Sequence, residues 1–551
     1  MDTRTMTALS YTSGPSSTPL LGETIGANLR RVAARLGDRD AVVSVHQDQR
    51  LSYAELDALV DRVGTALMGA GIERGDRVGI WAPNSLEWLV VQYATARIGA
   101  ILVNLNPAYR THEIEYALRQ SETKLLCSAT RHKTSDYAAM IDEVRGGLEA
   151  LERVVFIDDA DDWAPMAGVQ ADADALAERD AALSFDDPIN IQYTSGTTGA
   201  PKGATLTHHN LLNNGFMVGE LLDYTEADRV CLPVPFYHCF GMVMGNIGTL
   251  SHGGCVVIPA PSFEPAATLR AVAQERVTSL YGVPTMFIAM LAEPSFADTE
   301  LGSLRTGIMA GSPCPVEVMK RVVRDMNMEQ VSICYGMTET SPVSTQTRMD
   351  DPLERRVGTV GRVHPHVEVQ VVDPESGLVV ERGATGELCT RAYSVMLGYW
   401  NEPERTAEAV DRAGWMHTGD LATMDDDGYL NIVGRIKDMV IRGGENVYPR
   451  EIEEFLYAHE DIADVQVVGV PDERYGEELC AWVVARDGAA LDDEAVREFC
   501  RGRLAHYKVP RYVVLTDAFP MTVTGKVQKY VLREQAVERL GLAAAAAIQN
   551  A

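Results

Sequence analysis

Short apolar runs alternate with amphipathic stretches along most of this chain, and this alternation restricts the fold more than any other feature of the sequence. Ser52 and Glu55 form a capping box, which predicts the start of a helix. Apolar residues then recur on one face of that helix, at Leu56, Leu59, Val60, Val63 and Leu67. Strands are predicted at residues 41–45, 77–81, 101–105, 124–127 and 154–157. This order predicts an α/β protein with mostly parallel sheets covered by helices.

The second half of the chain continues this pattern and then departs from it. Strands are predicted at 229–233, 255–258, 277–281 and 306–309, and hairpin-like strands at 367–372 and 386–390 indicate a small β-rich unit. A compact α+β pattern then begins, with helices from Pro449 and Asp493 and strands at 465–469, 480–484 and 512–515. We expect a leader without regular structure at 1–20, an N-terminal domain at 21–435, a hinge at 436–437, a C-terminal domain at 438–540 and a tail at 541–551. The Ala/Asp/Glu-rich residues 171–182 are expected to form a solvated connection.

Composition narrows the class of protein. The net charge of −29 over 551 residues disfavours nucleic acid as a partner, because no basic patch offsets it. Nine cysteines without C-x-x-C spacing indicate neither a disulfide framework nor a zinc site, and are typical of a reduced, cytoplasmic protein. No run approaches the ~18 apolar residues of a membrane span, so no transmembrane segment is expected.

A glycine-rich and hydroxyl-rich segment at 193–203 indicates a phosphate-binding loop. Its glycines let backbone N–H groups converge, and its Ser/Thr hydroxyls and one lysine add donors for phosphate oxygens. The candidate contacts are Thr194, Ser195, Gly196, Thr197, Thr198, Gly199 and Lys202. The segment differs from the common P-loop, because Pro201 precedes the lysine and Gly203 follows it. A flexible linker is the alternative, which Pro-Lys-Gly and the strand-like flanks disfavour.

Other segments have a functional and a plain structural interpretation. Thr338 and Glu339 have oxygen donors that suit a divalent cation, and the Tyr335 ring suits stacking on a nucleobase. The alternative is a strand-to-helix turn in which Thr338 and Glu339 only cap the helix. Asp420 suits a ribose diol or an Asx turn. Lys526, on a Thr-Gly turn, is by itself a surface lysine.

Taken together and in this order, the segments resemble the adenylate-forming superfamily of acyl-CoA synthetases, firefly luciferases and nonribosomal peptide synthetase adenylation domains. The resemblance covers about residues 38–533. It implies an ATP site made of three parts. The adenine-side turn is Gly311, Ser312 and Pro313, and the adenine and Mg²⁺ motif is Tyr335, Gly336, Met337, Thr338 and Glu339. The two ribose contacts are Asp420 and Arg435. It also implies a hinge at Lys437, a catalytic lysine at Lys526 and a pantetheine tunnel beside Gly443 and Gly444.

The implied reaction uses ATP, Mg²⁺ and coenzyme A. A carboxylate attacks the α-phosphate to give an acyl-adenylate, and the mobile C-terminal domain then turns about Lys437 to admit the thiol. His238 would lie by the substrate carboxylate, with Phe236, Tyr237 and Met242 lining the acyl pocket. No acidic residue in 235–242 suits a substrate ammonium. The chain as a whole, including residues 341–344 and 357–362, most resembles medium-chain fatty acyl-CoA synthetases. Plain core packing is the alternative for these apolar side chains.

Three rival functions stay open at this point. One is a ligase that loads an acyl-carrier protein or stops at the adenylate, and another is an aryl-CoA ligase. The third is a non-enzymatic nucleotide-binding or scaffolding protein on the same fold, against which the retained Lys526 argues. A homodimer is compatible with all of them.

Overall fold

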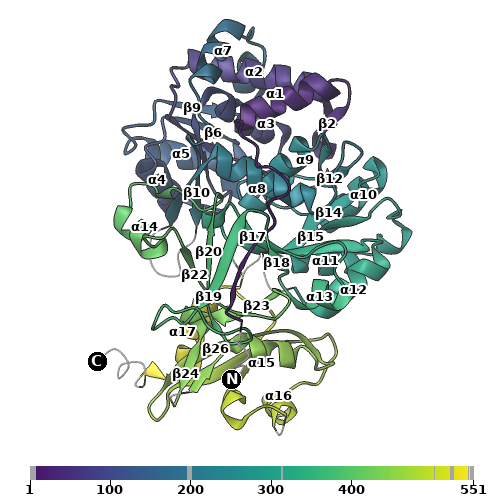
Figure 1. The fold of residues 1–551 in the computed structure, drawn as a ribbon, viewed down its shortest axis with the longest axis vertical. Helices are drawn as coiled ribbons and strands as arrows, with labels where there is room; N and C mark the ends of the chain where they lie inside the picture. Colours follow the sequence, from purple (N-terminus) through teal and green to yellow (C-terminus); the bar gives the residue numbers. More distant parts are fainter. Residues whose placement is uncertain are drawn as a thin grey trace, which may run out of the picture. The chain divides into compact units, whose positions relative to one another are not determined.

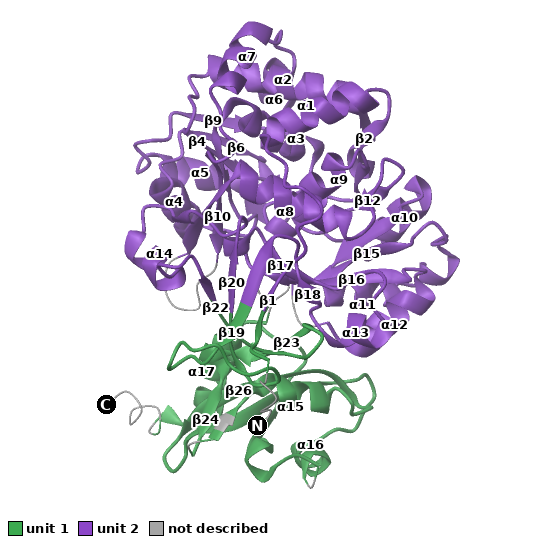
Figure 2. Cartoon of the chain, viewed as in Figure 1, with its two compact units in different colours: residues 1–11, 370–388, 418–551 green, residues 12–369, 389–417 purple. Residues whose placement is uncertain are grey.

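The computed structural model describes residues 8–194, 201–311, 314–443, 445–501, 503–521, 527–543 and 545. Backbone contacts divide the chain into two units (Figure 2). The larger unit holds residues 12–369 and 389–417, and the smaller unit holds residues 1–11, 370–388 and 418–551.

One sheet of the larger unit has seven strands in the order β21-β11-β10-β5-β4-β6-β9. Their bounds are Gly398–Tyr399, Lys202–Thr207, Pro188–Thr194, Ile101–Asn104, Arg77–Trp81, Leu125–Ser128 and Arg153–Phe156. The strands from β10 to β9 are parallel to their neighbours, whereas β11 is antiparallel to both β10 and β21. The predicted strands of this region and their parallel pairing are therefore confirmed.

The other sheet of the larger unit has nine strands in the order β18-β17-β16-β15-β14-β12-β13-β2-β3. Their bounds are Arg362–Val363, Val343–Gln346, Gln330–Gly336, Thr306–Ala310, Ser279–Gly282, Arg229–Cys231, Cys255–Ile258, Asp40–Ser44 and Gln49–Ser52. All pairs from β16 to β2 are parallel. The carboxyl ends of these strands therefore meet at one edge, which is where α/β sheets commonly bind ligands.

Helices cover both sheets (Figure 1). They are α1 Ile25–Leu36, α2 Tyr53–Gly69, α3 Leu86–Ile98, α4 Thr111–Gln120, α5 Tyr137–Arg145, α6 Ala160–Ala167, α7 Ala173–Ala181, α8 His208–Glu220, α9 Gly248–Ser251, α10 Pro265–Glu275, α11 Pro284–Ala292, α12 Val316–Asp325, α13 Leu353–Gly358 and α14 Pro403–Ala409. A short ribbon joins β7 Arg131–His132 and β8 Ser135–Asp136. Among the described residues, no helix is both long and apolar enough to span a bilayer.

Local sequence signals begin several of these helices. At α2 the Ser52 hydroxyl accepts from the Glu55 N–H, and the Glu55 carboxylate accepts from the Ser52 N–H at 2.8 Å. The predicted apolar face of α2 is buried, at Leu56, Leu59, Val60, Val63 and Leu67. Thr207 forms a second capping box with Asn210 at the start of α8. Each of these two helices therefore starts where its cap satisfies backbone N–H groups that have no partner within the helix.

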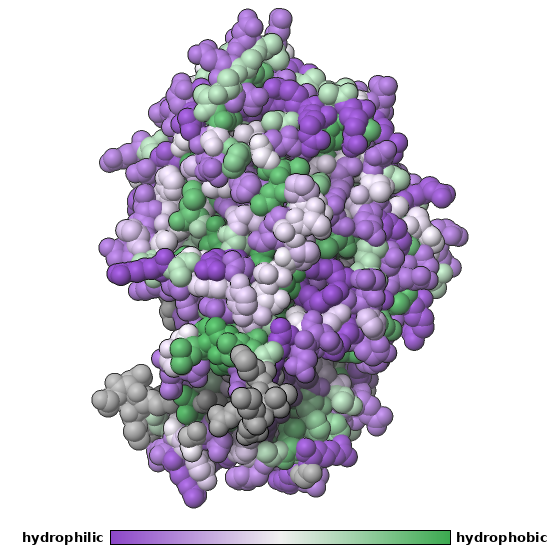
Figure 3. All heavy atoms as spheres, in the orientation of Figure 1, coloured by the Kyte–Doolittle hydropathy of each residue, from purple (hydrophilic) through white to green (hydrophobic). Residues whose placement is uncertain are grey.

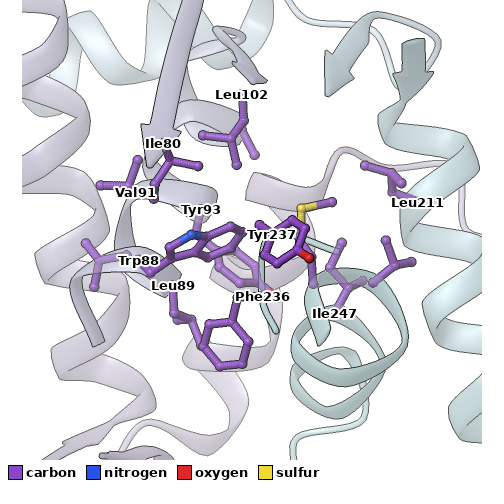
Figure 4. Close-up of a cluster of buried hydrophobic side chains, with 14 of the residues drawn as sticks. Ile80, Trp88, Leu89, Val91, Tyr93, Leu102, Leu211, Phe236, Tyr237 and Ile247 are labelled. Atoms are coloured by element: carbon purple, nitrogen blue, oxygen red, sulfur yellow. The ribbon is translucent and has the colours of Figure 1, made fainter. Parts of the chain in front are cut away.

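The core of the larger unit lies where α3 meets the strands and the segments that follow β12. Figure 4 shows Trp88 and Leu89 of α3 facing Phe236 and Tyr237, with Ile247 and Leu211 beyond them. The Trp88 and Phe236 rings meet edge to face at 5.6 Å, and both side chains are fully buried. Hydrophilic side chains cover most of the face drawn in Figure 3.

The smaller unit has its own core. β26 Ile462–Asp472 and β27 Gly476–Ala485 form a long hairpin, joined by β24 Val440–Arg442, β25 Glu445–Val447 and β28 Tyr512–Leu515. Its helices are α15 Pro449–Leu456, α16 Asp493–Cys500 and α17 Lys529–Arg539. The predicted C-terminal α+β pattern is therefore confirmed. A further sheet, in the order β1-β19-β20-β22-β23, holds the predicted hairpin-like strands, with bounds Tyr11–Ser13, Val367–Val372, Gly386–Ala392, Met416–Met424 and Leu430–Arg435.

Two expectations about loops are corrected. The solvated connection predicted at 171–182 contains helix α7, which Asp172 caps by accepting from the Ala175 N–H and which buries Leu176. Within the leader predicted at 1–20, β1 forms because Ser10 N donates to Val380 O at 2.8 Å and Gly14 N donates to Val367 O at 2.8 Å. The hinge predicted at 436–437 falls inside the smaller unit and stays a prediction.

Candidate functional site

The predicted adenine side lies at the carboxyl ends of β15 and β16. Ala310 pairs with Cys334, so Gly311, the first residue after β15, lies beside Tyr335, which is still part of β16. Gly311 has φ +91°, where an L side chain would be strained, and an added Cβ would lie 3.1 Å from Val283 Cγ1. The structure thus brings Gly311 and Tyr335 together, whereas Ser312 and Pro313 lie outside the described residues.

The turn after β16 is closed by hydrogen bonds. Met337 N donates to Pro342 O at 2.9 Å, and the Thr340 hydroxyl donates to the same carbonyl at 2.8 Å. A Cβ at Gly336 would lie only 1.7 Å from that carbonyl oxygen, so the backbone approach requires glycine. A 3₁₀ turn over Thr338–Thr340 follows, which gives Thr338 and Glu339 a defined place.

Glu339 is held on two sides. The hydroxyl of Tyr399 donates to its Oε1 at 2.8 Å, and Met396 N donates to its backbone carbonyl at 2.9 Å. Its other carboxylate oxygen, Oε2, has no hydrogen-bond partner in the part of the chain that the structure describes. A carboxylate oxygen and the nearby Thr338 hydroxyl are hard donors, so the residues present fit Mg²⁺ with phosphate and water as its remaining ligands.

Tyr399 connects Glu339 with the phosphate-loop lysine. Through the pairing of β21 with β11, Tyr399 lies opposite Ala204, and the Lys202 ammonium lies 4.8 Å from the Tyr399 ring centroid. Burial raises the pKa of the Tyr399 hydroxyl well above its ordinary value, and the Glu339 charge adds to the rise. The hydroxyl therefore stays a donor at neutral pH. Sequence analysis missed Tyr399, because nothing local marks it.

The predicted phosphate loop joins β10 to β11. Thr194 pairs with Lys202 at the end of this hairpin, and Trp400 N donates to Gly203 O at 2.8 Å beside it. The Tyr116 hydroxyl donates to Pro201 O at 3.2 Å. The remaining predicted contacts lie outside the described residues, namely Ser195, Gly196, Thr197, Thr198 and Gly199. The structure thus places Thr194 and Lys202 at the two ends of the loop.

The segment predicted to meet the substrate acid lies close to the same turn. The Cys239 thiol lies 3.6 Å from His238 Nδ1 and 3.8 Å from the Thr338 hydroxyl, and His238 Nδ1 accepts from Phe240 N at 3.1 Å. Sequence analysis did not identify Cys239 as the link between His238 and Thr338.

The three predicted acyl-pocket side chains are buried in the core. Phe236 packs on Trp88, Tyr237 lies beside it in Figure 4, and Met242 lies in the π-helix Phe240–Ile247. This placement agrees with the core-packing alternative, and a role in acyl binding stays a prediction.

The remaining candidates belong to the smaller unit. Asp420 and Arg435 pair across β22 and β23, with Arg435 Nε donating to Asp420 Oδ1 at 2.9 Å. The Asp420 side chain is 10 % exposed and that of Arg435 54 %. Lys437 lies in a 3₁₀ turn, Ile436–Asp438, directly after β23. The predicted ribose contacts therefore adjoin the predicted hinge.

Gly443 forms the turn between β24 and β25. It has φ +61°, and its N–H donates to Tyr475 O at 2.9 Å. Beside it, Arg442 donates two hydrogen bonds, at 2.7 and 2.8 Å, to the fully buried Glu478. Gly444 and Lys526 lie outside the described residues, so their predicted roles stay predictions.

This fold and site define a nucleotide-binding α/β protein of the adenylate-forming class. The sequence model described as AMP-binding enzyme matches residues 29–400, and the one described as AMP-binding enzyme C-terminal domain matches residues 451–526. The chain therefore belongs to the AMP-binding enzyme family, and the predicted superfamily and fold class are confirmed.

Relatives at high identity cover almost the whole chain. It is 47 % identical to the putative acyl-CoA synthetase YngI of Bacillus subtilis, over 95 % of this chain and 99 % of that protein. It is 43 % identical to the mitochondrial medium-chain acyl-CoA ligase ACSF2 of Danio rerio, over 97 % of this chain and 91 % of that protein.

Solved structures share the fold. The ATP-bound MatB from Rhodopseudomonas palustris has a TM-score of 0.80 at 32 % identity, covering 93 % of this chain and 99 % of that one. The anthranilate CoA ligase AuaEII, in complex with anthranoyl-AMP, has a TM-score of 0.82 at 26 % identity, covering 94 % and 98 %.

Proposed function

We propose that this protein is a fatty acid–CoA ligase that forms AMP, with medium-chain acids as its substrates. The observation that carries the proposal is the 41–47 % identity, over 95–97 % of the chain, to relatives named acyl-CoA synthetase or medium-chain acyl-CoA ligase. The scaffold alternative is disfavoured, because the site retains Lys202, Thr338 and Glu339 in one place.

In the first half-reaction an oxygen of the fatty acid carboxylate attacks the α-phosphate of ATP. The bond to the bridging oxygen breaks, and pyrophosphate leaves with the electron pair, giving the acyl-adenylate. Lys202 and the hydroxyls of its loop hold the leaving phosphates, while His238 orients the carboxylate and the Tyr335 ring carries the adenine. Mg²⁺, held through Glu339 and Thr338, neutralises phosphate charge when bound. Asp420 accepts from the ribose hydroxyls.

In the second half-reaction the thiol of coenzyme A attacks the acyl carbonyl, and AMP leaves. The thiol proton passes to solvent or to the departing phosphate, and no net redox change occurs. The resemblance assigns Lys526 to adenylation, the turn at Gly443 and Gly444 to the thiol path and Lys437 to the domain rotation between the two steps. A cytoplasmic location and a homodimer belong to the same proposal.

A carboxylate panel tests this function. Pyrophosphate release is measured with saturated acids of increasing length, benzoate, anthranilate and amino acids, each with and without coenzyme A. Chains of roughly six to twelve carbons should react best, because each buried CH₂ adds about 0.8 kcal/mol until the pocket ends. Acetate and amino acids should be poor substrates.

The same panel separates the rivals. The structural likeness to an anthranilate CoA ligase favours one rival, the aryl-CoA ligase. That rival would be established if an aromatic acid exceeded octanoate about ten-fold in kcat/KM, which is equivalent to about 1.4 kcal/mol. Turnover with an acyl-carrier protein but not with coenzyme A would establish a carrier-loading ligase.

A further inference from the structure

We propose that Tyr399 is a positioning residue that sets the geometry of Glu339 toward the metal and of Lys202 toward the phosphates. The inference rests on the proposed function for the identity of the ligand, Mg·ATP, and adds a residue that carries none of the predicted roles. Its physical basis is one side chain whose two ends contact two different functional groups of the site.

The hydroxyl end acts on Glu339. Tyr399 and Glu339 are 60 residues apart, are 7 % and 5 % exposed, and join at 2.8 Å between the hydroxyl and Oε1. A buried polar group has to be hydrogen-bonded, and this bond supplies a partner for one of the two carboxylate oxygens. Because the Tyr399 hydroxyl donates to Oε1, it fixes the orientation of the carboxylate and leaves Oε2 to bind the cation. Side chains that hydrogen-bond to a metal ligand commonly orient that ligand in this way.

The ring end acts on Lys202. Its ammonium lies 4.8 Å from the Tyr399 ring centroid, within the range of a cation–π contact. The contact limits the directions that the flexible lysine takes, so its charge is directed before the phosphates arrive.

The backbone keeps Tyr399 in place independently of either contact. Tyr399 N donates to the Thr406 hydroxyl at 2.9 Å, and the flanking Leu397 and Trp400 N–H groups donate to Thr205 O at 2.9 Å and Gly203 O at 2.8 Å. The bonds to Thr205 and Gly203 tie the segment around β21 to β11, the strand that begins with Lys202. One rigid strand pair therefore carries both the lysine and the tyrosine, and Tyr399→Phe should leave that pair intact.

Two substitutions separate the two ends. Tyr399→Phe removes the hydroxyl and keeps the ring, and Tyr399→Leu removes both. Calorimetry then measures ATP binding without a carboxylate substrate, once over a range of Mg²⁺ concentrations and once with EDTA. In Tyr399→Phe the half-saturating Mg²⁺ concentration should rise about ten-fold, the usual effect of losing an outer partner of a metal ligand, with metal-free ATP binding unchanged. In Tyr399→Leu metal-free ATP binding should weaken as well.

Tyr224→Phe is the matched control. Its buried hydroxyl bonds Ser279 Oγ at 2.5 Å and the Tyr281 hydroxyl at 3.1 Å rather than Glu339 or Lys202, so this variant should bind Mg·ATP as the unaltered protein does. Thermal unfolding of each variant reports whether it folds. If Tyr399→Leu does not fold, Tyr399→Phe alone decides the hydroxyl role.

A double-mutant cycle tests whether Tyr399 acts through Glu339. Glu339→Gln combined with Tyr399→Phe should need no more Mg²⁺ than Glu339→Gln alone. Additive effects, or an unchanged Mg²⁺ titration in Tyr399→Phe, would overturn the inference. The proposed function is tested separately, and it fails if the unaltered protein forms no acyl-adenylate with any acid of the panel. In that case the ATP-binding measurements still decide the role of Tyr399.

Discussion

Lys202 shows what one cation contributes in a strongly acidic protein. The chain carries a net charge of −29, so a phosphate-rich ligand must meet local positive groups rather than a basic surface. Many arginines of the larger unit already pair with acids, as Arg229 does with Asp40 and Glu275 at 3.0 and 2.5 Å. Lys202 instead lies over the ring of Tyr399 at the end of the phosphate loop.

Replacing Lys202 by alanine should raise the KM for Mg·ATP about ten-fold or more, because a hydrogen bond to a charged group is lost. The fold should persist, since Lys202 is only partly buried. Initial rates of pyrophosphate release against ATP concentration measure the effect. Lys320→Ala, which removes a lysine paired with Glu317 on α12, is the control. Normal turnover at low ATP in Lys202→Ala would refute its phosphate role.

At the scale of an element, the turn between β16 and β17 decides where Tyr335, Thr338 and Glu339 lie. β16 ends the run of parallel strands, and β17 returns antiparallel to it with an irregularity between Tyr335 and Gly336. The close approach of Gly336 to Pro342 makes this reversal sharp.

Gly336→Ala should therefore disturb both stability and binding. The added Cβ would lie 1.7 Å from the Pro342 carbonyl oxygen, so the backbone has to shift, at a cost of about 1–3 kcal/mol. We expect a lower midpoint of thermal unfolding and weaker ATP binding by calorimetry. Gly69→Ala, at the end of α2 with nothing within 4 Å of an added Cβ, should show neither effect. Unchanged ATP binding in a Gly336→Ala protein would separate this turn from the nucleotide site.

At the scale of the whole molecule, one chain has to carry out two reactions. Adenylation and thioester formation require different groups beside the same carbonyl, and a domain rotation is a common way to exchange them. Lys437 lies in the Ile436–Asp438 turn, between β23, which carries Arg435, and β24, which leads to Gly443.

Lys526→Ala and Lys437→Pro should separate the half-reactions. Without the Lys526 charge the protein should fail with fatty acid and ATP, yet convert supplied acyl-adenylate and coenzyme A at a near-normal rate. Lys437→Pro should do the reverse, because proline fixes φ where the chain has to turn. Lys437→Ala, which keeps that freedom, is the control. The rate of each half-reaction is the measurement, and a parallel fall of both rates in Lys526→Ala would contradict the division of labour.

The sequence determined those features that depend on residues near one another in the chain. The capping box at Ser52 lies where it was predicted, and the strands at 77–81, 255–258 and 512–515 have their predicted bounds. Such signals survive folding because a cap and its N–H partner are only three residues apart. The order of the motifs likewise determined the superfamily.

The tertiary structure decided which distant side chains meet. The bond between Tyr399 and Glu339, the placement of Phe236 against Trp88 and the burial of Leu176 on α7 have no local signature. Each depends on strands and helices that pack only after the chain has closed long loops. The polar segment at 171–182 could be a solvated connection or a capped helix, and an apolar side chain such as Phe236 could line a pocket or fill the core. The sequence is the same in both cases. What differs is which other parts of the chain pack against these residues, and only the folded structure shows this.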